Sequence, residues 1–139
     1  MELLRRESRL LVQRLRLWTP VRFAASAPPW GTRGDLVHHL AQDLADRAAH
    51  AEGGPRRLLP RLDSDLGRPD QLAVTADDLV RAGPPPQVAV AATAHLLAHR
   101  VELLADQVPA GLAAALGLDD VLAAGHQACN RDERDTTSL

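Results

Sequence analysis

The sequence has very few aromatic residues and no lysine, isoleucine or tyrosine. It contains two tryptophans and one phenylalanine, so few large rings are available for a core or for an aromatic binding surface. Isoleucine and the aromatic residues favour strands, whereas leucine and alanine, which are frequent here, favour helices. The composition therefore predicts an all-α fold.

Other absences exclude whole classes of protein. A single cysteine, Cys129, cannot form an internal disulfide. The formal net charge of −2 provides no positive field that would attract nucleic acid, so we expect no nucleic-acid partner. No apolar run approaches the roughly 20 residues of a membrane span, and the first residues lack the apolar core of a secretion signal. We therefore expect a soluble, cytoplasmic protein that does not associate with a membrane.

The 139 residues are sufficient for one domain with a buried core. Apolar residues recur at helical spacing in four long segments, which are bounded by residues that commonly begin or end helices. These segments are 3–18, 32–53, 70–82 and 86–108, with a short turn of helix near Phe23 and a weaker helix at 110–124. We predict an up-and-down four-helix bundle with a short extra C-terminal helix, formed by residues 1–129. The polar segment 130–139 is expected to be a disordered tail.

The segment 53–69 has no helical or strand period and is rich in proline, glycine and arginine, which predicts a surface loop or an extended strap. Within it, residues 63–67 (DSDLG) superficially resemble a calcium-binding loop. The glycine falls one position early, and Val74 stands where a chelating glutamate would be needed. An ordinary aspartate-rich turn is the expected structure.

The segment 86–108 contains the longest apolar seam in the chain, and we predict that this seam faces the core. The seam consists of Val90, Ala94, Leu97, Val101, Leu104 and Val108. His95 and His99 lie on the next row of the same helix, together with Glu102 and Asp106. This row is expected at the edge of the buried face.

Two histidines four residues apart place two imidazoles on one face of a helix. A third imidazole from another helix would complete a three-ligand metal site with open positions for water or a substrate. Such a site would bring the pKa of a bound water or thiol close to neutrality. The candidate third ligand is His38 or His39, and both are predicted to flank the apolar stripe of the segment 32–53.

Two motifs resemble the DinB/YfiT-like superfamily, which includes mycothiol-dependent maleylpyruvate isomerases. Residues 29–41 (PWGTRGDLVHHLA) resemble the beginning of its second helix, where a Trp and a Thr or Ser precede Asp-Leu-Val-x-His-Leu. Residues 95–103 (HLLAHRVEL) resemble the His-x-x-x-His-Arg-Gly-Gln-Leu pattern of its last bundle helix, with valine and glutamate in place of glycine and glutamine.

This resemblance implies a four-helix bundle that holds a divalent metal such as zinc, nickel or iron on His39, His95 and His99. An ungapped match of the first motif selects His38 instead of His39. For some members of the superfamily the implied activity is a thiol-dependent transfer or isomerisation, with a small thiol or another small molecule as substrate.

A different interpretation stays open. The histidines of both segments would be half-exposed helix residues that hydrogen-bond to Asp43 or Glu102. The protein would then be a non-enzymatic interaction module, for example a homodimer, in which the first or fourth long helix presents a surface to a partner. His126 and Cys129 form a second pair that would suit a soft metal, although a simple reduced thiol explains the cysteine equally well.

Overall fold

The computed structural model describes residues 1–105, and Met1–Leu103 form one compact unit. Four long helices are packed together, which confirms the all-α bundle predicted from the sequence. They are α1 (Glu2–Leu15), α3 (Arg33–Glu52), α4 (Arg68–Arg81) and α5 (Pro86–Leu104). The short elements are the helix α2 (Pro20–Ala24), the strands β1 (Ser26–Ala27) and β2 (Gly31–Thr32), and the 3₁₀ turn η1 (Asp65–Gly67). The predicted helix at 110–124, the tail 130–139 and the pair His126 and Cys129 lie outside the described residues.

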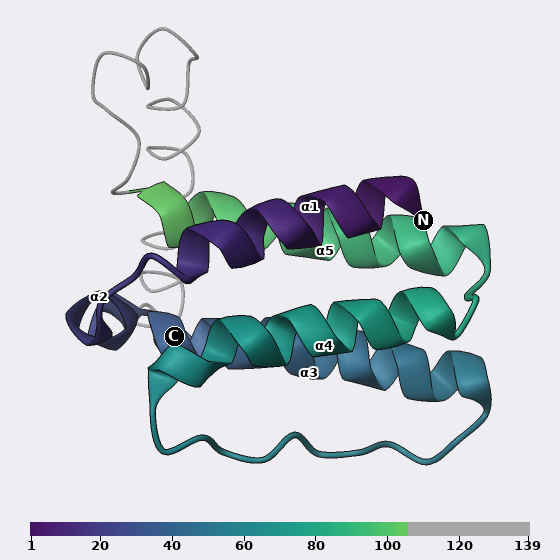
Figure 1. Cartoon of the computed structure of the whole chain (residues 1–139), viewed down its shortest axis with the longest axis horizontal. Coiled ribbons are helices and arrows are strands. Elements are labelled where there is room, and N and C mark those ends of the chain that lie inside the picture. Colours follow the sequence, from purple (N-terminus) through teal and green to yellow (C-terminus); the bar gives the residue numbers. More distant parts are fainter. Residues whose placement is uncertain (106–139) are drawn as a thin grey trace, which may run out of the picture. The chain divides into compact units, whose positions relative to one another are not determined.

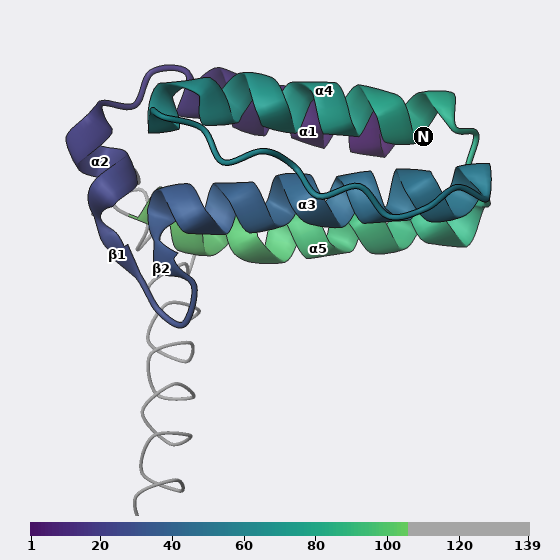
Figure 2. The ribbon, with the colours of Figure 1, turned by 90° about the horizontal axis from the view of Figure 1, so that it is seen from below.

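Around the bundle the helices follow the order α1, α4, α3, α5, so each has two neighbours (Figure 1 and Figure 2). Arg16, just after α1, pairs with Asp70 in the first turn of α4, and the two helices are therefore antiparallel. His38 and Arg68, near the beginnings of α3 and α4, are joined by a hydrogen bond, so these two helices run in the same direction. The directions thus do not simply alternate, because the long segment after α3 returns the chain to the end at which α3 began.

This returning segment, residues 53–64, is the extended strap expected from its composition, and it lies along α3 (Figure 2). The side-chain amide of Gln42 donates to the carbonyl of Arg57 at 2.9 Å and accepts from the backbone N–H of Leu59 at 2.9 Å. Arg56 adds an ion pair with Asp46 at 2.9 Å. Side chains of α3 thereby satisfy backbone groups of the strap that would otherwise need water.

A tight hairpin and a helix cap define where α3 begins. Strands β1 and β2 pair antiparallel, with Ser26 opposite Thr32, and the Pro28–Pro29 peptide between them is cis. Thr32 and Asp35 form a capping box, in which each side chain accepts a hydrogen bond from the backbone N–H of the other. The hydrogen bond from the Thr32 N–H holds the pKa of Asp35 below its usual value of 3.8. The hairpin places Trp30 directly beside the first turns of α3.

Most of the apolar seam predicted to face the core on the last long helix instead lies on the surface, so this prediction was wrong for Val90, Ala94 and Val101. Leu104 is buried as predicted, and Val108 lies outside the described residues. Val90 is 68% and Val101 41% exposed, and Ala94 is exposed as well. The face that α5 buries consists of Ala89, Ala92, Thr93, Leu96, Leu103 and Leu104. Because α5 is apolar on nearly every side, the spacing of its apolar residues did not distinguish the packed stripe from the free one.

No described helix is both long and apolar enough to cross a membrane.

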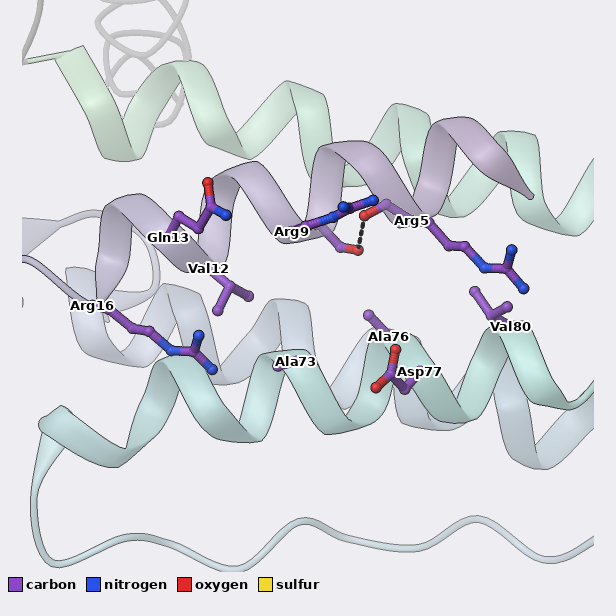
Figure 3. Close-up of a pocket in the computed structure, with 10 residues that line it drawn as sticks. Arg5, Arg9, Val12, Gln13, Arg16, Ala73, Ala76, Asp77 and Val80 are labelled. Atoms are coloured by element: carbon purple, nitrogen blue, oxygen red, sulfur yellow. Dashed lines mark hydrogen bonds between the residues drawn. The ribbon is translucent and has the colours of Figure 1, made fainter.

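A groove of about 430 Å³ lies between α1 and α4 (Figure 3). Its floor is made of small side chains such as Ala73 and Ala76, while Arg5 and Arg16 stand on the α1 wall. Glu2 and Asp70 pair with these two arginines, and Asp77 lines the opposite wall. The groove therefore carries balanced charge.

Candidate metal centre

The structure brings together the three histidines that the family resemblance selects. His39 comes from α3, whereas His95 and His99 come from adjacent turns of α5. The ring centroids are 5.4 Å apart for His39 and His95, 5.9 Å for His39 and His99, and 4.7 Å for His95 and His99. One ligand nitrogen from each ring lies within 4.8 Å of the other two.

This spacing is close to what a metal requires. Three atoms separated by at most 4.8 Å all lie within about 2.8 Å of a common point, compared with the 2.0–2.1 Å of a zinc–imidazole bond. Each nitrogen would have to move inward by about 0.7 Å to reach the length of such a bond. The three nitrogens are thus close enough together that they could hold a shared ion.

His38 is held at a different interface. Successive residues of a helix point about 100° apart, so neighbouring histidines cannot both face α5. The Nη1 group of Arg68 donates to His38 Nδ1 at 2.8 Å, and Arg68 is buried and also pairs with Asp65. Both histidines flank the apolar stripe of α3 as expected, but one flank faces α4 and the other faces α5. His38 does not substitute for His39 in this cluster.

Two of the clustered imidazoles each have one nitrogen without a hydrogen bond to the described residues. The Nε2 atoms of His39 and His95 are buried and have no partner within the described part of the chain. Buried polar atoms are normally satisfied, because leaving one unpaired costs about 1–3 kcal/mol. His99 differs, since its Nδ1 lies 3.4 Å from Glu102 Oε2, which leaves its Nε2 available. A carboxylate on the far nitrogen is the usual way in which proteins orient a metal-binding histidine.

The electrostatic environment keeps two of these rings neutral. Burial is the main cause that lowers the pKa of His39 and of His95 below 6.5, and the neighbouring histidines lower it further. Asp43, one turn after His39 on α3, acts in the opposite direction on both. Only a neutral imidazole has a lone pair to give to a metal, so the environment favours the ligating form.

Trp30 is part of the site, although the sequence did not identify it as a contact of the histidines. Its ring stacks on His39 with centroids 4.1 Å apart and an interplanar angle of 26°. It also meets the ring of His99 edge-on at 5.5 Å. The motif at residues 29–41 includes this tryptophan, which was the only indication in the sequence that it belongs to the site. Only the hairpin geometry reveals that its ring covers one side of the cluster.

The metal-free protein should become less stable as the pH falls below 6.5. Above 6.5 both rings are neutral in the folded and the unfolded chain, whereas below it the unfolded chain takes up protons first, because the folded pKa values are lower. Urea unfolding with a chelator present, repeated from pH 7.5 to pH 5, measures this slope. A double variant, His39→Asn/His95→Asn, should give a shallower slope, and an unchanged slope would contradict the assignment.

The chain matches no model of a protein family, no curated protein and no solved structure.

Proposed function

We propose that the protein is a DinB/YfiT-like metal-binding protein that holds one divalent metal on His39, His95 and His99. The observation that carries this proposal is the cluster of three histidines, each of which offers one ring nitrogen within 4.8 Å of the other two. In addition, the Nε2 atoms of His39 and His95 are buried without a partner among the described residues. A purely structural histidine normally satisfies its buried nitrogens, whereas two of the clustered histidines each have a buried nitrogen without a partner among the described residues. Imidazole ligands suit zinc, nickel and iron, which are the candidate ions.

Three protein ligands leave at least one coordination position for water or a substrate. The bound ion would supply Lewis acidity, which brings the pKa of a coordinated water or thiol close to neutrality. The chain's own residues would shape the site: Glu102 orients His99, and Trp30 shields the ring of His39. This arrangement suits a thiol-dependent transfer or isomerisation of a small molecule, the activity that the two family-like motifs imply.

Metal analysis of protein purified without a histidine tag tests the proposal. After incubation with zinc, nickel or ferrous iron and removal of excess ion, we expect about one equivalent of metal per chain. His39→Ala, His95→Ala and His99→Ala should each weaken binding by at least about 100-fold, because loss of a ligand exceeds the 10–100-fold typical of a lost supporting contact. Titration calorimetry gives the dissociation constants.

Two neighbouring histidines provide matched controls. His38 lies next to His39 but contacts Arg68, and His50 is exposed further along α3. His38→Ala and His50→Ala should retain the full equivalent of metal. Protein that stays metal-free and folded in every trial, or equal loss of metal in His38→Ala and His39→Ala, would refute the site.

A further inference from the structure

Helix α5 carries a second apolar stripe that points away from the bundle core. It runs through Val90, Ala94, Leu97 and Val101, at intervals of four, three and four residues. Both valines and Ala94 are exposed, and Leu97 is partly so. Residues 86–98 contain no charged side chain. A surface helix normally has a polar outer face, so this one has the pattern of a helix that packs on both sides.

Helix α1 extends this apolar surface. The two helices lie side by side (Figure 1), and an ion pair of 2.7 Å between Glu7 and Arg100 marks the line where they meet. Leu3 and Leu10 lie one turn before and one turn after Glu7, on the same side of α1, and both are exposed. The other side of α1, toward α4, carries arginines instead (Figure 3). The apolar side of α1 therefore adjoins the free stripe of α5.

We propose that the α5 stripe binds the same stripe of a second copy of this chain, with the two α5 helices antiparallel around a two-fold axis. The intervals four, three and four read the same in both directions, so an axis midway between Ala94 and Leu97 places every residue of one stripe opposite a residue of the other. Val90 of one copy then lies opposite Val101 of the other, and Ala94 lies opposite Leu97. A small residue facing a large one is the arrangement in which knobs fit into holes.

The distribution of charge favours this pairing over other ways of joining two copies. The charged residues of α5 among residues 86–104 are Arg100 and Glu102, both close to its C-terminal end. In an antiparallel pair these ends lie far apart, so like charges do not meet. Pairing through α1 would instead bring together Arg6 and Arg14 of both copies, which flank Leu10 one turn to either side.

The apolar area available on α5 and α1 would make this a small interface. The 19 residues of α5 span roughly 28 Å, and a face two helices wide offers on the order of 500 Å² per copy. Two copies would bury about 1,000 Å², which is at the lower limit for specific interfaces. We therefore expect a reversible dimer and not a permanent one.

Sedimentation equilibrium of the full chain, from about 1 to 500 μM, tests the proposal. The expected result is a concentration-dependent monomer–dimer equilibrium, weakened at least tenfold by Val90→Glu and by Val101→Glu. Val74→Glu is the matched control, because Val74 is an exposed valine on α4 and should leave dimerisation unchanged. Circular dichroism confirms that each variant is folded. A chain that is monomeric throughout, or equal effects at Val74 and Val90, would overturn the proposal.

Cysteine cross-linking tests the antiparallel register. In a Cys129→Ser background, Val90→Cys and Val101→Cys are prepared as separate variants and oxidised alone or mixed. Only the mixture should give a disulfide-linked dimer, because position 90 lies roughly 17 Å from position 90 of the second copy along the helices. Cross-linking of Val90→Cys alone would indicate a parallel pair and contradict the antiparallel arrangement. Neither experiment depends on bound metal.

Discussion

Replacement of Phe23 by alanine should lower the free energy of unfolding by about 3–5 kcal/mol. Phe23 is the only phenylalanine of the chain and is completely buried. Its ring packs against Trp18 with centroids 5.1 Å apart and planes tilted by 58°. Helix α2, which carries it, contacts α3, so the ring fills one end of the bundle. The chain has too few aromatic residues for another ring to move into the resulting cavity, and urea unfolding measures the loss.

Val21→Ala is the matched control, since Val21 lies two residues earlier in the same short helix and is 82% exposed. This change should stay within about 0.5 kcal/mol of the unmodified protein. Because Phe23→Ala removes a large part of a typical domain's 5–15 kcal/mol, Phe23→Leu provides a milder test with a smaller expected loss. Similar losses at Val21 and Phe23 would contradict the buried position of the ring.

Zinc should raise the free energy of unfolding by about 4 kcal/mol when free metal is about 1,000-fold above its dissociation constant. The ion would join α3 to α5, whereas the unfolded chain does not hold the three imidazoles together. Thermal unfolding with zinc, with zinc followed by a chelator, and without metal measures the effect. The chelator should return the transition to that of the metal-free protein.

The double variant His95→Ala/His99→Ala should show no zinc-dependent shift. His38→Ala is the informative comparison, because it removes the contact with Arg68 and leaves His39, His95 and His99 in place. We expect this variant to be less stable than the unmodified protein yet to keep the full zinc shift. A double variant that is still stabilised by zinc would place the ion elsewhere and contradict a site on His39, His95 and His99.

Local signals in the sequence were sufficient for most of the secondary structure. Thr32 and Asp35 cap α3, and Gly53 ends it with a positive φ of 71°, which glycine adopts readily. Pro86 is the first residue of α5, a position where its missing N–H costs nothing. These features act within one turn of the chain, so the sequence reveals them without knowledge of any distant contact. The His-x-x-x-His pair on one face of α5 was evident for the same reason.

Two features depend on the tertiary structure alone: which of two adjacent histidines joins the cluster, and which apolar stripe of α5 is buried. His38 and His39 are adjacent and flank the same apolar stripe, and only the packing of α3 between α4 and α5 assigns one to Arg68 and the other to the cluster. Likewise, α5 has two apolar stripes, and only its neighbours determine which one is buried. The sequence by itself determined the helices and the candidate ligands, because these depend on nearby residues. The third ligand and the free stripe depend on how helices distant in the chain are arranged around one another.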